Sequence, residues 1–329
     1  MNWSDDGQLP VAIEHIEQDQ ILQVGLTYLV QERNLLGEIV PEILALVPDA
    51  SRWRLTLTGD VAATVNALEA RGEGDGYTTS RGAGHVGGVS LPRDDGSFDI
   101  VLGAELFVDP PGDYDDLDGL VEAAIKSGRH LARHEAGHVL LRLRDEDALS
   151  YRDRPQLTPS AAAWTHNVAV HMDDFRIERH TRMHTPPEFS HLEGLGGAIM
   201  HLSRELAASK SSWREDLESA AERSDVAIGG FIRVIAYLAS ELGLEQQGNP
   251  VTPRVEPEKW DRYLGTTWPL WSSLFHKLRP VDEPMSQIEL AGILGELCEL
   301  ACNWSGAIGY ERGVTDDART YAFWTRESY

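Results

Sequence analysis

Hydrophobic and polar positions repeat along this chain with two different periods. Trp53, Leu55 and Leu57 alternate with polar side chains, which is the two-residue period of a β-strand with one buried face. The segments 85–92 and 98–107, separated by RDDGS, predict a β-hairpin. The glycine-rich run before it, residues 71–88, contains a formal GxGxxG but leads into a strand-like segment instead of a helix, so it predicts a loop.

Helical periodicity surrounds and follows these strands. Residues 16–46 predict two helices, the second interrupted at Pro41, and Asp60 stands where it can cap a helix in residues 61–72. From Asp116 to Leu143 the apolar positions again follow the helical period, as they do in residues 161–183. Beyond about residue 195 every periodic segment is helical.

This order of elements predicts an α+β fold, with a small mixed sheet over a long helix and a mainly helical C-terminal lobe. Three regions are expected. They are N-terminal helices in residues 1–48, a core in residues 49–194 and the helical lobe in residues 195–329.

Charge and terminal sequence narrow the classes of partner. The 329-residue chain carries a formal net charge of −24, which disfavours binding to nucleic acid or to an anionic membrane. Its first ten residues, MNWSDDGQLP, are acidic and polar, and no apolar run reaches the ~18 residues of a membrane span. We therefore expect a cytoplasmic protein that binds neither nucleic acid nor membrane. The sequence does not indicate its oligomeric state.

The candidate chemistry lies in RHEAGHVLL, residues 133–141. His134 and His138 are four residues apart on the expected helix, so their imidazoles lie about 40° apart around its axis and can share one metal ion. Glu135 between them can take a proton from a water that the metal activates. This is the HExxH pattern of zinc hydrolases, and it predicts Zn²⁺ as the cofactor. His130, one turn earlier, fits better as a solvated histidine or one at the edge of the core.

A third ligand is expected on the following helix. Asn167, His171, Asp174 and Glu178 fall within an arc of about 60° on one face. A solvated face is the ordinary explanation for charged helix residues such as Asp173, Glu178 and Arg179. A stripe that combines amide, imidazole and two carboxylates is less easily explained in that way.

The motif HEAGH and the later run DDFRIE together resemble the zincin metallopeptidases, in the gluzincin arrangement.

 The run DDFRIE, which contains Asp174 and Glu178, begins 35 residues after His138. The resemblance covers roughly residues 50–185. It implies a zincin-like core in which the sheet edge receives an extended peptide, His134 and His138 as zinc ligands, Glu135 as the catalytic base, and an acidic third ligand on the next helix.

The match to that family departs at the third ligand. Gluzincins use glutamate at the first acidic position, whereas this chain has the shorter Asp174. Asp174 is the first choice for the ligand, and Glu178 is either the alternative ligand or the carboxylate that orients a ligand histidine. His171 is a third alternative.

The expected function is that of a zinc metallopeptidase, which hydrolyses peptide bonds of a peptide or protein substrate with a zinc-bound water activated by Glu135. The alternative is a non-catalytic zincin-like regulatory or scaffold protein that binds zinc and a protein partner. The intact Glu135 favours the peptidase, because a structural zinc site needs no base. The spacing selects no residue to stabilise the oxyanion among the candidates Tyr151, His180, His184 and His191.

Overall fold

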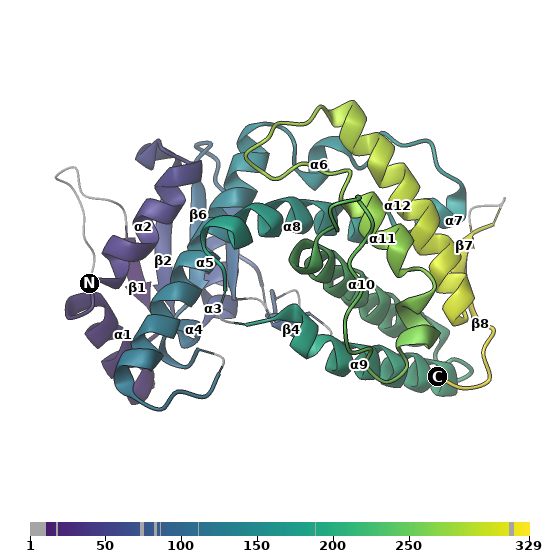
Figure 1. Cartoon of the computed structure of the whole chain (residues 1–329), viewed down its shortest axis with the longest axis horizontal. Helices are drawn as coiled ribbons and strands as arrows, with labels where there is room; N and C mark the ends of the chain where they lie inside the picture. Colours follow the sequence, from purple (N-terminus) through teal and green to yellow (C-terminus); the bar gives the residue numbers. More distant parts are fainter. Residues whose placement is uncertain are drawn as a thin grey trace. The chain divides into compact units, whose positions relative to one another are not determined.

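The computed structural model describes residues 11–329 except 18, 73–75, 82–83, 86, 111, 188 and 316–318 (Figure 1). The chain forms two compact units. The described residues within Met1–Ser80, His85–Leu143 and Thr181–Phe189 make up the first unit, and those within Arg81–Gly84, Arg144–His180 and Ser190–Tyr329 make up the second. Helices and a small mixed sheet together give the α+β composition that the sequence predicts.

The sheet of the first unit has four strands in the order β1-β2-β6-β5. These strands are β1 (Val11–Glu14), β2 (Trp53–Thr58), β6 (Phe98–Gly103) and β5 (Gly88–Pro92). β2 runs parallel to both β1 and β6, whereas β5 is antiparallel to β6. The predicted strand and hairpin are confirmed, and β1 is an addition that the sequence did not reveal.

The register of β5 and β6 separates the two faces of the sheet. Val89 pairs with Val101, and both contribute to a small apolar cluster with α3 (Val61–Leu68). Side chains of neighbouring residues point to opposite faces, so the next pair, Ser90 and Ile100, belongs to the other face. Ser90 contacts α5 (Leu117–Leu143) there. Asp60 caps α3 as predicted, accepting a hydrogen bond from the Ala63 amide at 2.9 Å.

Three further helices complete the first unit, namely α1 (Gln20–Gln31), α2 (Leu35–Leu46) and α4 (Glu105–Val108). Figure 1 shows α2 beside α5, and the two helices pack along each other. The predicted interruption at Pro41 is wrong, because α2 continues through it. Its buried face includes Ile39 and Ile43, and tertiary packing of that face outweighs the poor helix propensity of proline. Residues 105–107, predicted as part of the hairpin, belong to α4 instead.

The second unit is mainly helical. Its helices are α6 (Ala148–Tyr151), α7 (Pro159–Ala162), α8 (Thr165–His184), α9 (His191–Ser212), α10 (Leu217–Leu242), α11 (Trp268–Phe275) and α12 (Gln287–Ile308). The last turn of α8, from Thr181, is counted with the first unit. A large apolar core with several tryptophans joins these helices, and α9 and α10 pack along each other.

The prediction that every periodic segment beyond residue 195 is helical is wrong at the C-terminal end. There β7 (Tyr310–Val314) and β8 (Thr320–Trp324) form an antiparallel hairpin. Shorter elements are the 3₁₀ turn Ala50–Arg52, the π turn Asp261–Gly265, and the two-residue strands β3 (Ser80–Arg81) and β4 (Gly84–His85). None of the helices in the described ranges has the length and apolar character needed to cross a membrane.

Candidate metal centre

His134 and His138 lie together on α5, as their spacing predicts. Their ring centroids are 5.2 Å apart and the rings are nearly perpendicular. His134 is buried and His138 is partly exposed, and the small residues Ala136 and Gly137 between them are buried. The sequence contains no proline in this 27-residue helix, so the pairing rests on uninterrupted helical geometry. Two imidazoles in this arrangement are suited to one zinc ion.

The side chain of Glu135 contacts strand β5. The Oγ atom of Ser90 lies 2.9 Å from Oε2 of Glu135 and 2.8 Å from its backbone oxygen, and its hydroxyl donates to this residue. A Cβ atom on Gly88 would stand 2.9 Å from Cγ and from Oε1 of Glu135, so the glycine leaves room for the carboxylate. Sequence reasoning assigned no role to Ser90 or Gly88. The only signal was the glycine pair at the start of the predicted hairpin strand.

His130 is buried rather than solvated, with 5% of its surface exposed. Its Nδ1 lies 2.8 Å from the backbone oxygen of Thr185, and its ring meets Phe189 edge-on. A carbonyl oxygen only accepts hydrogen bonds, so Nδ1 carries the hydrogen and Nε2 is the nitrogen with a lone pair. The His130 and His134 ring centroids are 6.4 Å apart. A neutral His130 with this hydrogen bond therefore keeps its lone pair on Nε2, a nitrogen that could bind a metal ion, although the sequence favoured a solvated or core-edge histidine.

The other side of α5 bears two arginines that share one buried carboxylate. Glu42 of α2 accepts hydrogen bonds from the Nε atoms of Arg129, at 2.7 Å, and of Arg133, at 2.8 Å. The Glu42 side chain is 5% exposed, while those of Arg129 and Arg133 are 41% and 13% exposed. The hydrogen bonds to Glu42 attach α5 to α2 at Arg133, the residue before His134.

The predicted polar stripe on α8 is present, but its members have different surroundings. His171 holds Asp174 through a 3.0 Å contact from Nδ1 to Oδ2, and its Nε2 lies 3.1 Å from the backbone oxygen of Gly229 on α10. A Cβ atom on Gly229 would also stand 2.8 Å from the side chain of Asn167. Both nitrogens of His171 face acceptor oxygens, which suits an imidazole that orients Asp174 and disfavours His171 as a metal ligand.

Asp173 and Glu178 are buried, so the solvated-face explanation is wrong for both. Asp173 accepts hydrogen bonds from the Tyr151 hydroxyl at 2.8 Å and from the Ala148 amide at 2.7 Å. Burial raises the pKa of the Asp173 carboxyl well above its ordinary value, although these two donors act in the opposite direction. Tyr151 is itself fully buried against Asp173, which disfavours it as an oxyanion donor.

The three histidines that were candidate oxyanion donors have different surroundings. His180 contacts Asp282 with Nδ1 3.0 Å from Oδ1, and His191 lies 3.6 Å from Glu178, measured from Nε2 to Oε1. His184 is exposed at the end of α8. The Glu178 carboxylate is therefore next to an imidazole within the second unit.

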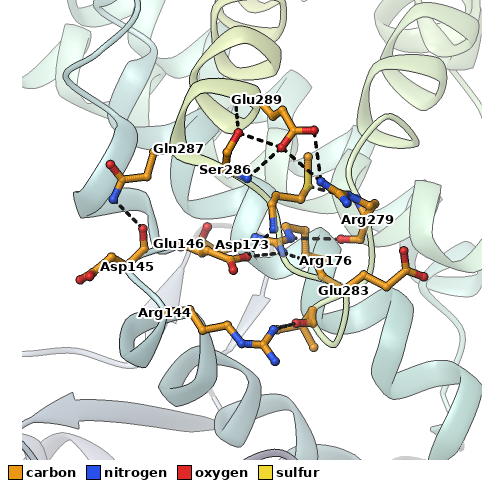
Figure 2. Close-up of polar contacts among 12 residues, drawn as sticks. Arg144, Asp145, Glu146, Asp173, Arg176, Arg279, Glu283, Ser286, Gln287 and Glu289 are labelled. Atoms are coloured by element: carbon orange, nitrogen blue, oxygen red, sulfur yellow. Dashed lines mark hydrogen bonds and ion pairs between the residues drawn. The ribbon is translucent and has the colours of Figure 1, made fainter.

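Arg176 anchors α8 within the second unit (Figure 2). Its side chain is fully buried, and Nη2 donates to Oε2 of Glu146 at 2.7 Å and to the backbone oxygen of Glu283 at 3.0 Å. Nε donates to the backbone oxygen of Arg279 at 3.0 Å. Glu146 also accepts the Met285 amide at 3.1 Å. The turns of α8 that carry Asp173 and Asp174 are thus tied to residues 279–285.

Comparison with known proteins adds no assignment. No family model, no curated protein and no solved structure matches this chain.

Proposed function

We propose that the chain is a zinc-dependent metallopeptidase with a zincin-like core. The observation that carries the proposal is the histidine pair on α5 together with the adjacent Glu135, whose carboxylate contacts Ser90 on strand β5. A purely structural zinc site normally closes all four positions with protein ligands and needs no base. A glutamate held next to a two-histidine pair is typical of a hydrolytic site.

The proposed zinc ligands are His134, His138 and Asp174. His134 and His138 lie together on α5, and we expect Asp174 of α8 to complete their set, with Glu178 as the alternative. Two imidazoles and a carboxylate match the donor set of catalytic zinc sites.

Zinc bound there would supply a Lewis acid that polarises a peptide carbonyl and makes a water molecule easier to deprotonate. Glu135 would accept the proton from that water and later deliver it to the leaving amine. The Ser90 hydroxyl holds the Glu135 carboxylate by a hydrogen bond, which limits the orientations of the base. His171 would orient Asp174 in the same way through its Nδ1 contact.

The sheet supports a peptide as the substrate. β5 stands at one end of the strand order β1-β2-β6-β5, directly beside Glu135. An extended peptide can add to such an edge through backbone hydrogen bonds, which places its carbonyl groups along the strand. This mode of recognition suits a peptide or protein substrate better than a small ester.

The first test measures metal per chain by elemental analysis after reconstitution with zinc. We expect about one zinc in the parent chain and a large loss in His134→Ala and Asp174→Ala, because removal of one ligand from a three-ligand site weakens binding strongly. Asp153→Ala is the matched control, since its side chain is 87% exposed. Zinc retained by Asp174→Ala but lost by Glu178→Ala would assign the third ligand to Glu178. No zinc in the reconstituted parent would refute the proposal.

The second test separates a peptidase from a zinc-binding scaffold. The parent chain and Glu135→Gln are incubated with a mixed peptide library, and new termini are counted by mass spectrometry. The parent is expected to cleave peptides, whereas the glutamine variant retains zinc and cleaves none, because an amide cannot accept the proton. Full zinc occupancy without any cleavage by the parent would favour the non-catalytic alternative.

A further inference from the structure

An apolar pocket of about 450 Å³ opens on the first unit, formed by three helices: α1, α4 and α5. Figure 1 shows α1 and α4 beside the first turns of α5. The apolar side chains that line the pocket include Ile21, Val24, Leu29, Phe107, Leu117 and Leu120. Ile21, Val24 and Leu117 have 76%, 61% and 57% of their surface exposed. Such a concentration of exposed apolar surface marks an interaction site more often than isolated residues do.

The two long walls of the pocket have helical periodicity. On α1, Ile21, Val24 and Tyr28 are spaced i, i+3 and i+7, so they lie on one face of the helix. On α5, Leu117, Leu120 and Ala124 follow the same spacing. The two apolar faces are suited to packing against the apolar ridge of an additional helix.

The residues that line the pocket also disfavour an extended peptide as its occupant. All residues that line the pocket belong to helices, so the pocket offers no strand edge with which a peptide backbone could pair. An extended chain would leave its amide and carbonyl groups without partners in apolar surroundings, which costs free energy. A helix satisfies these groups internally and presents only side chains.

The charges around the pocket define the partner further. Residues 16–33 contain three acidic residues and one arginine, and residues 105–126 contain seven acidic residues and one lysine. Arg33 pairs with Asp118 and Lys126 pairs with Glu122, so the acidic residues remain in excess. Asp115, Asp116 and Asp118 are exposed at the start of α5. This rim repels the carboxylate of a fatty acid, and it repels a second copy of the chain, whose pocket has the same acidic rim. It attracts a segment with lysine and arginine on its polar face.

We propose that this pocket binds a basic amphipathic helix of a partner protein, with apolar anchors at i, i+3, i+4 and i+7 and basic side chains beside them. The site is independent of the proposed zinc centre, because none of its lining residues is a candidate ligand.

The test uses a designed 14-residue peptide with leucine at the anchor positions and lysine elsewhere, titrated against the full chain by calorimetry. Two control peptides replace every lysine with glutamate or insert a central proline. The lysine peptide is expected to bind, and its affinity is expected to fall with rising salt, because screening weakens attraction between exposed charges. Both control peptides are expected to bind at least about tenfold more weakly.

Variants of the chain locate the binding. Val24→Asn removes apolar contact without a change in charge, and it is expected to weaken the lysine peptide by about tenfold. Ile288→Asn on α12 is the matched control, since Ile288 is 80% exposed and lies outside the pocket. The proposal is overturned if no lysine peptide binds, if the glutamate peptide binds equally well, or if Val24→Asn leaves the affinity unchanged. Self-association of the chain that Val24→Asn abolishes would also overturn it, because the occupant would be a second copy.

Discussion

The two helices with the candidate ligands, α5 and α8, bury charge in different ways. On α5, Arg129 and Arg133 reach one buried carboxylate, Glu42, and both arginine side chains are partly exposed. On α8, Arg176 has no exposed surface and is enclosed by Glu146 and two backbone oxygens. The difference shows that α8 holds a fully enclosed charge with a single carboxylate as its counter-ion, whereas α5 can return its charges to water.

The largest expected effect comes from removal of the carboxylate that pairs with Arg176. Glu146→Ala should lower the free energy of unfolding by about 3–5 kcal/mol, because it leaves a buried guanidinium without its counter-ion. The measurement is urea denaturation followed by circular dichroism. The control, Glu296→Ala, breaks an exposed pair with Lys277 and should cost less than about 1 kcal/mol. Equal losses in the two variants would remove the contrast between the helices.

The corresponding change beside α5 should cost less. Glu42→Ala leaves two arginines without their shared carboxylate, but both side chains can turn towards solvent, so we expect a loss of about 1–3 kcal/mol. The same denaturation experiment gives the value. A loss as large as that of Glu146→Ala would mean that the α5 arginines are as dependent on pairing as Arg176.

A smaller effect is expected where β5 meets Glu135. Gly88→Ala adds a methyl group 2.9 Å from the Glu135 side chain, which must move, at a cost of about 1–2 kcal/mol. Zinc content should remain that of the parent, while the peptide cleavage of the second test should fall because the base is displaced. Unchanged cleavage would show that the position of Glu135 tolerates this shift.

The smallest effect has the opposite sign. Gly194 lies inside α9, and a Cβ atom placed there meets no heavy atom within 4 Å. Gly194→Ala should raise the free energy of unfolding by about 0.5–1 kcal/mol, since alanine has the higher helix propensity. Thermal denaturation of both glycine variants should therefore move the midpoint in opposite directions. A stabilised Gly88→Ala would contradict the tight contact with Glu135.

Local signals in the sequence were sufficient for some elements. The alternation in residues 53–58, the cap at Asp60 and the period of residues 117–143 each depend on neighbours in the chain, and the structure confirms them. The missed elements depend on distant partners. β1 pairs with β2, which lies more than 40 residues later in the chain. The strand β8 packs Trp324 against a core that is formed mainly by helices.

The candidate site also combines features that depend on local sequence with features that depend on distant partners. The spacing of His134 and His138 follows from helix geometry alone, so it could be predicted. The contact of Glu135 with Ser90 joins residues 45 positions apart, and the burial of Arg176 depends on Glu283, 107 positions away. The pattern of hydrophobic and polar positions predicts that such polar residues are exposed, because their partners are not neighbours in the sequence.

The residues that enclose Arg176 also determine how this region opens. Residues 279–285 have no helix or strand, yet the Val281 amide donates to the backbone oxygen of Arg176 and the Met285 amide donates to Glu146. Both amides are therefore hydrogen-bonded to the two residues, Arg176 and Glu146, whose pairing anchors α8. In deuterated water they should exchange together with the central amides of α8, as one cooperative opening unit of an irregular segment and a helix.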